Sequence, residues 1–213
     1  MKKAIVHDLL ALGMVIFTLL LRIPYLNLLA ALILILIYTY KKQGIKAELG
    51  FARPDRIGNT IIMGALLAIV IVASSYFLML PLFEMLTGQP LALGIFEQLR
   101  GNTGLLLTSL ALGWIVGGLI EEIIFRAFFI SRCANMLSDK ISVVIGAILS
   151  STLFGYLHTY QGPSGQLLTG FVGLILATIY IVNYRNIWLN VFTHGFVNTF
   201  GMLLLYFDVI KLG

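Results

Sequence analysis

Two adjacent acidic residues, Glu121 and Glu122, interrupt a long apolar stretch, and Arg126 follows four residues after the second. Residues 105–120, which precede the pair, carry no charge. A charged side chain at membrane depth costs about 2.5–3.5 kcal/mol on insertion scales, and such residues usually face the bundle interior and mark a site. Glu122 and Arg126 have the spacing and order that favour an ion pair on an α-helix, so we expect this pair to be structural.

Glu121 lies about 100° away from Glu122 around an α-helix, and Arg126 cannot easily serve both carboxylates. Glu121 must therefore find a partner on another helix, bind a metal ion or water, or stay protonated. We expect Glu121 to carry chemistry as a general base or acid, while Glu122 supports the architecture.

Three further polar residues lie in or at the ends of later apolar stretches. His158 follows the apolar run 141–157, and His194 and Asn198 share one helix face because they are four residues apart. Taken singly, each is at least as consistent with an interfacial residue or a helix-to-helix hydrogen bond. Taken with Glu121, they supply a water activator, an imidazole acid or metal ligand, and an amide donor for an oxyanion. These groups together could hydrolyse an amide bond.

The composition places this set of residues in a membrane. Of 213 residues, 60% are hydrophobic and only 11% are charged, with a mean hydropathy of +1.01, whereas a soluble domain carries roughly 25% charged residues. Lipid permits only helices or closed barrels, and the apolar runs lack a strand-type alternation. The sequence therefore predicts an all-α polytopic transmembrane helix bundle.

About seven spans are expected, in one membrane-embedded domain covering 1–213 whose motif-bearing core is 103–208. The first two apolar runs could form a hairpin, or one interfacial piece and one span. Two longer loops are expected at 41–56 and 83–102, the first lying along the inner interface. The expected spans are 9–21, 23–40, 61–80, 105–130, 141–157, 165–184 and 186–207.

The basic residues predict the orientation of the chain. The alternate loops hold little beyond Arg22, Arg100 and Lys211, so the positive-inside rule places the N-terminus in the cytoplasm. The net charge of +5 then reflects topology and anionic lipid. Nucleic acid is not an expected partner, because no basic face is interleaved with stacking aromatics. The residues predicted to be cytoplasmic are Lys2, Lys3, Lys41, Lys42, Lys46, Arg53, Arg56, Arg132, Lys140 and Arg185.

Three short motifs carry a resemblance to a known family. The segment EEIIFR at 121–126 matches EExxxR, FGYLH at 154–158 matches FxxxH, and HGFVN at 194–198 matches HxxxN. In this order on successive apolar segments they resemble the CPBP family, the CAAX-protease and bacteriocin-processing membrane endopeptidases, also called the Abi family. The short chain without added domains is similar to the bacterial branch of that family.

The resemblance implies a role for each motif residue. Glu121 would activate the attacking water with help from His158, His194 and Asn198 would stabilise the oxyanion, and Glu122 with Arg126 would hold the site. The substrate would be a membrane-associated peptide, lipid-modified ones included. The protein would then be integral to the bacterial cytoplasmic membrane.

Zinc is an open alternative at this stage. Two histidines and a glutamate with an open water position would suit a catalytic zinc ion. Neither an HExxH motif nor a CxxC pair is present, since Cys133 is the single cysteine. A metal-independent glutamate mechanism fits equally well, and we favour it slightly.

A depth estimate conflicts with a converging site. With ideal straight helices starting at residues 103, 140 and 186, Glu121 would lie about 27 Å from the outer face, His194 about 12 Å from the inner face and His158 about 27 Å from it. Convergence then requires tilted helices, a span that begins later than residue 103, or a hairpin around Gly162 and Pro163 sunk into the bundle.

Two other functions remain open: a non-catalytic bacteriocin-immunity or scaffold protein and, less favoured, a proton-coupled transporter. A transporter would usually show internal repeats with interrupted helices, and the sequence shows none. The oligomeric state and the identity of the substrate do not follow from the sequence.

Overall fold

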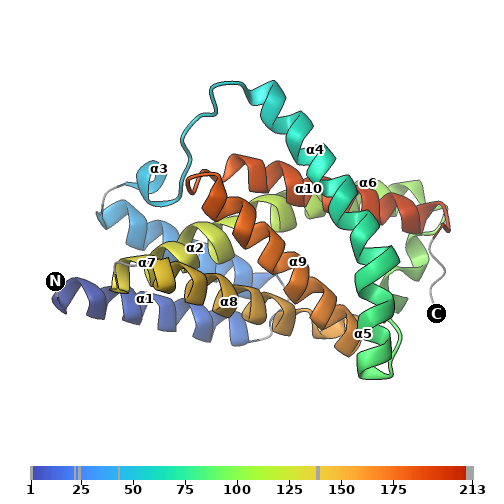
Figure 1. The fold of residues 1–213 in the computed structure, drawn as a ribbon, viewed down its shortest axis with the longest axis horizontal. Coiled ribbons are helices and arrows are strands. Elements are labelled where there is room, and N and C mark those ends of the chain that lie inside the picture. The colour runs from blue at the N-terminus through green and yellow to red at the C-terminus, as the bar shows by residue number, and fades with distance from the viewer. Residues whose placement is uncertain (1, 22, 24, 43, 138–139, 210–213) are drawn as a thin grey trace.

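The computed structural model describes residues 2–21, 23, 25–42, 44–137 and 140–209, and every regular element among them is a helix. Figure 1 shows these helices packed side by side, which confirms the predicted all-α polytopic bundle. Arg22 and Lys211, which entered the prediction of topology, lie outside the described residues. The single domain over 1–213 stays a prediction.

The N-terminal segment forms a helical hairpin. Its two arms are α1 (Lys2–Leu20) and α2 (Leu26–Lys42), which lie side by side in Figure 1. Leu19, Ala31 and Ile35 are fully buried where the hairpin meets the rest of the bundle. The first two predicted spans therefore correspond to this hairpin, and the short α3 (Ile45–Glu48) follows it.

A long helical rod follows, running from Ile57 to Thr87 through α4 (Ile57–Ser74), the π-helical turn η1 (Ser75–Met79) and α5 (Leu80–Thr87). Pro81 has no backbone N–H, so the ladder of helical hydrogen bonds must adjust in the turn before it. The rod packs across α10 and, through α5, against α9 (Figure 1).

The prediction that a loop covers 83–102 is wrong in part. The rod continues to Thr87, where Gly88 ends it in the left-handed conformation that glycine adopts without strain, with φ 67°. A 3₁₀ helix, η2 (Gly94–Leu99), occupies the second half of the predicted loop. Apolar side chains at its start and end pack on α6 and α10, so this connection is folded onto the bundle.

The motif-bearing helix runs through α6 (Thr103–Leu112), η3 (Gly113–Ile130) and α7 (Ser131–Leu137). The expected α-helix at 105–130 is instead a wide π-helix over most of its length, with hydrogen bonds from residue i to residue i+5. This conformation begins at Gly113, the first of three glycines that pack against α10. π-Helical segments are rare and often occur at functional sites.

The C-terminal part contains α8 (Lys140–Leu157), the 3₁₀ turn η4 (Thr159–Gln161), α9 (Gly162–Val182) and α10 (Trp188–Tyr206). α9 begins with Gly162 and Pro163, and proline suits the first turn because its missing N–H needs no partner there. α8 and α9 pack closely, and α10 lies between α4 and η3.

Four helices among the described residues are long and apolar enough to cross a membrane: Ile57–Thr87, Thr103–Met136, Lys140–Leu157 and Thr159–Val182. The other three predicted spans correspond to α1, α2 and α10. The total of seven crossings stays a prediction.

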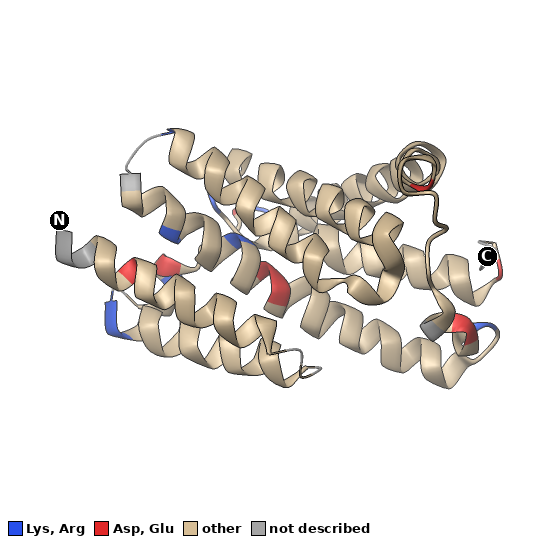
Figure 2. Ribbon diagram, turned by 90° about the horizontal axis from the view of Figure 1, so that it is seen from below, with Lys and Arg blue, Asp and Glu red and all other residues tan. Residues whose placement is uncertain are grey.

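A buried ionic cluster ties the N-terminal hairpin to the motif-bearing helix. The Arg132 guanidinium on α7 contacts Asp8 of α1 at 3.3 Å and also pairs with Glu48 of α3, and Arg132 is only 2% exposed. Asp8 further accepts hydrogen bonds from Tyr38 and Lys42 of α2. Figure 2 shows these acidic and basic segments close together near the N-terminal end.

We predict that Arg132→Met lowers the free energy of unfolding by about 3–5 kcal/mol, because it leaves the largely buried Glu48 carboxylate without its cation and leaves Asp8 with Lys42 alone. Arg100→Met is the matched control: it breaks the exposed Arg100–Asp208 pair, which spans 2.6 Å with side chains 51% and 45% exposed, and should cost about 0–1 kcal/mol. Reversible unfolding in mixed detergent measures both. Equal losses in the two variants would contradict the structural role assigned to Arg132.

Candidate active site

The four residues predicted to do chemistry line one cavity of about 670 Å³. Glu121 comes from η3, His158 follows the end of α8, and His194 and Asn198 come from α10. The depth conflict disappears because the helix carrying Glu121 spans 34 residues, well beyond the ~20 that a membrane crossing needs. Its membrane crossing therefore need not begin at residue 103.

Glu122 is completely buried, and both of its oxygens have partners. Oε1 accepts a hydrogen bond from Arg126 at 2.8 Å and lies 2.7 Å from His194 Nδ1, while Oε2 accepts one from Asn190 Nδ2 at 3.1 Å. The expected Glu122–Arg126 ion pair is thus present, although the helix is π-helical. A carboxylate that is fully buried with both oxygens hydrogen-bonded inside the protein does not reach a substrate, which suits a structural role.

Arg126 extends the same network to two further elements. Its second terminal nitrogen donates to the Gly173 carbonyl of α9 at 3.1 Å, and its guanidinium lies over the Phe154 ring of α8 at 4.6 Å. Carboxylate, carbonyl and aromatic face are all favourable partners for a buried guanidinium. Arg126 therefore joins η3, α8 and α9 behind Phe154, which lines the cavity.

His194 lies between the two glutamates. Its Nδ1 is 2.7 Å from Glu122 Oε1, and its Nε2 is 3.8 Å from Glu121 Oε2. Glu122 fixes the orientation of the ring, while Glu121 stays beyond direct hydrogen-bond distance. Glu121 is also the more accessible carboxylate, with a side chain 13% exposed against 0% for Glu122, so of the two it is the one that faces the cavity.

His158 has a defined tautomer. Its Nδ1 lies 2.7 Å from the Phe154 carbonyl, and because a carbonyl only accepts, Nδ1 must carry the proton. In the neutral ring Nε2 is then free to accept a proton or a hydrogen bond. The ring packs on Phe154 with centroids 4.7 Å apart, which holds His158 at the cavity wall.

Asn198 presents its amide to the cavity beside η3. Its Nδ2 donates one hydrogen to the Gly113 carbonyl at 2.9 Å, which leaves the second hydrogen of that amide for another acceptor. A Cβ at Gly117 would lie 2.3 Å from this nitrogen, so the position of Asn198 depends on a glycine there.

Glycines also set the close approach of η3 and α10. A Cβ at Gly195 would lie 2.4 Å from the Trp114 ring, and one at Gly118 would meet the backbone of α10 at 3.3 Å. Trp114 Nε1 donates to Thr199 Oγ1 at 3.0 Å on the same face. This packing brings the motif of η3 against the motif of α10.

Sequence reasoning missed Asn190. This residue is fully buried and donates to Glu122 Oε2 and, at 2.7 Å, to the Leu176 carbonyl of α9. It precedes His194 by four residues, the same spacing that joins His194 to Asn198. A polar stripe of three residues on α10 was therefore a signal available in the sequence.

The arrangement also bears on metal binding. Among the residues that the structure describes, no group of three His, Cys, Asp or Glu side chains is placed to hold a metal ion. The residues considered for zinc, Glu121, His158 and His194, share the cavity wall without forming such a group.

Comparison with known proteins shows that part of this chain is similar to one family. Residues 103–200 match the model of a family described as type II CAAX prenyl endopeptidase Rce1-like. This match confirms the resemblance to the CPBP family that the three motifs indicated. No curated protein and no solved structure matches the chain.

We predict that Gly195→Ala destabilises the protein by about 1–3 kcal/mol, because the new methyl group must displace the Trp114 ring. Gly201→Ala lies on the same helix with no atom within 4 Å of the added Cβ, so it should be neutral or stabilising by up to about 1 kcal/mol. Thermal unfolding in detergent compares the two. A tolerated Gly195→Ala would show that the helices need not approach so closely.

Proposed function

We propose that this chain hydrolyses peptide bonds of membrane-associated peptides or proteins, lipid-modified ones included, because residues 103–200 match the model of the Rce1-like CAAX prenyl endopeptidases. One observation carries the proposal. Glu121, His158, His194 and Asn198, from three separate parts of the chain, line a single cavity in which Glu121 is the carboxylate left without a cation of its own.

In the proposed mechanism, Glu121 activates the attacking water. Its carboxylate removes a proton from a water molecule held between Glu121 and His158 Nε2, and the water oxygen adds to the scissile carbonyl carbon. The Phe154 carbonyl supports this step, because it fixes the His158 proton on Nδ1 and leaves Nε2 as the acceptor. Glu121 is the base, and His158 orients the water.

His194 and Asn198 stabilise the negative charge that develops on the carbonyl oxygen. When protonated on both ring nitrogens, His194 donates from Nδ1 to Glu122 and keeps Nε2–H for the oxyanion. The second amide hydrogen of Asn198 is the other donor.

The tetrahedral intermediate then collapses. Glu121, now protonated, gives its proton to the leaving nitrogen, the C–N bond breaks, and a carboxylic acid and an amine are released. We propose that this sequence proceeds without a metal ion, since Glu121, His158, His194 and Asn198 together provide every proton transfer and both oxyanion donors that the reaction requires.

We predict that Glu121→Gln lowers kcat by about 10²–10⁴, because an amide cannot take a proton from water. Wild type and variant are compared in detergent on quenched peptides, lipid-modified and plain. Glu97→Gln, which alters an exposed glutamate on η2, should leave cleavage unchanged, and chelator should have no effect.

Each result has a defined meaning. Loss of cleavage with chelator, restored by zinc, would replace the metal-free mechanism with a zinc-dependent one. Full cleavage or full biological function in Glu121→Gln would refute the assignment of Glu121 and favour a non-catalytic immunity or scaffold role.

We predict that Asn198→Asp lowers kcat by about 10²–10³ with little change in KM, because the carboxylate keeps the shape of the side chain but has no N–H for the oxyanion. Steady-state kinetics on the best peptide measures both constants, and thermal unfolding checks that the variant is folded. A rise in KM alone would assign Asn198 to substrate binding.

A further inference from the structure

The basic residues gather at one end of the bundle. Lys42, Lys46, Lys140 and Arg185 line a common hollow there, although they come from the end of α2, from α3, from the start of α8 and from the turn after α9. Arg53 and Arg56 follow in the segment that leads into α4. Figure 2 shows most of the basic segments in the half of the molecule that carries the N-terminus.

The active-site cavity extends to the opposite end. Its wall includes Tyr25 before α2, Phe96 of η2 and Tyr160 of η4, all in connections between helices. Tyr25 and Tyr160 are 62% and 45% exposed, so these connections form the mouth of the cavity. Glu121 is the one Lys, Arg, Asp or Glu among the described residues that line this cavity.

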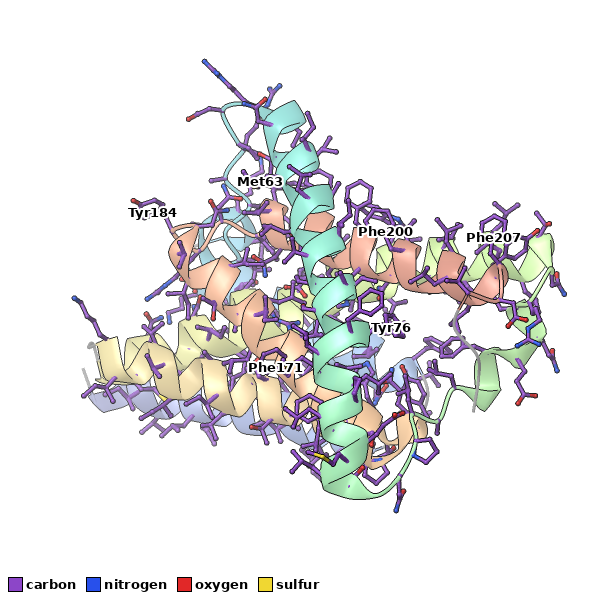
Figure 3. The ribbon with its side chains drawn as sticks, turned by 45° about the vertical axis from the view of Figure 1, so that its right-hand side comes forward. Met63, Tyr76, Phe171, Tyr184, Phe200 and Phe207 are labelled. Atoms are coloured by element: carbon purple, nitrogen blue, oxygen red, sulfur yellow. The ribbon has the colours of Figure 1, made fainter. Side chains whose placement is uncertain are left out.

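Single helices connect the two ends. α2 begins beside Tyr25 and ends at Lys42, whereas α8 begins at Lys140 and ends beside His158. α9 likewise begins next to the mouth and ends just before Arg185. Figure 3 shows Tyr184, in the turn after α9, at the left edge of the molecule and well apart from Tyr76 of the cavity wall, which lies right of the centre. The mouth and the basic hollow therefore face opposite sides of the membrane.

The mouth end carries fewer basic residues than the opposite end. The loops predicted for that side hold Arg22, Arg100 and Lys211, whereas ten basic residues are predicted for the other side. Basic residues close to span ends remain on the cytoplasmic side, and their bias sets the orientation of the chain. The basic hollow is thus cytoplasmic, and the mouth of the cavity opens on the other face.

We propose that the active site accepts its substrate from the non-cytoplasmic face of the membrane, an inference that rests on the proposed peptidase function. The substrate class is an exported peptide, or a membrane-anchored protein whose scissile segment lies on that face. Water reaches Glu121 from the same side, through the mouth lined by Tyr25 and Tyr160. Peptides confined to the cytoplasm are not substrates.

Cysteine labelling tests the direction of opening. In a Cys133→Ser background, which has no other cysteine, Tyr160→Cys places a thiol at the mouth and Tyr184→Cys places one at the 96% exposed opposite turn. A membrane-impermeant maleimide should label Tyr160→Cys in intact cells and Tyr184→Cys only in inverted vesicles. The reverse pattern would overturn the proposal. Tyr25→Cys provides a second thiol at the mouth if Tyr160→Cys does not fold.

A second arm tests the route to the site. A membrane-impermeant quenched peptide that the detergent-solubilised enzyme cleaves should be cleaved by right-side-out vesicles and not by sealed inverted ones. Labelling Tyr160→Cys should abolish this cleavage, whereas labelling Tyr184→Cys in opened vesicles should not. Cleavage only by inverted vesicles would refute the proposed face. Outward labelling of the mouth with no cleavage in detergent would instead refute the peptidase function and leave the direction of opening established.

Discussion

The fold around the cavity depends on the requirement that charge buried in apolar surroundings be neutralised and hydrogen-bonded. Glu122 meets this requirement with Arg126 on its own helix and with Asn190 and His194 on α10. Arg126 in turn reaches the Gly173 carbonyl of α9. Removing any of these partners would leave an unpaired group at a cost of several kcal/mol, so the buried ion pair fixes the relative positions of three helices.

The close contact of η3 with α10 serves the same requirement. Short side chains such as asparagine and the histidine ring reach across only when the two backbones are near, and Gly117, Gly118 and Gly195 provide that nearness. The free carboxylate of Glu121 is then held beside His194 by the same packing. The structural groups and the reactive groups therefore lie on the same helix pair. The rigid network around Glu122 supports the placement of Glu121 and His194.

Much of this site could be predicted from residue types alone. Glu121, His158, His194 and Asn198 stand out because polar groups in apolar helices are expensive, and the Glu122–Arg126 pair follows from their spacing. The π-helix at Gly113–Ile130 could not be predicted, since the shift from i+4 to i+5 bonding leaves no mark in side-chain chemistry. The end of the helix at Thr87 could not be predicted either. An apolar run indicates only which residues lie in lipid, and a helix can continue beyond the apolar run.

The network around Glu122 has a consequence for how the protein is made. Glu122 and His194 are 72 residues apart in sequence, so η3 is synthesised well before α10. During that interval Arg126 alone neutralises Glu122, and Glu121 has neither histidine nor amide beside it. Only the Glu122–Arg126 pair is complete within η3, and the reactive centre is assembled when the later helix arrives.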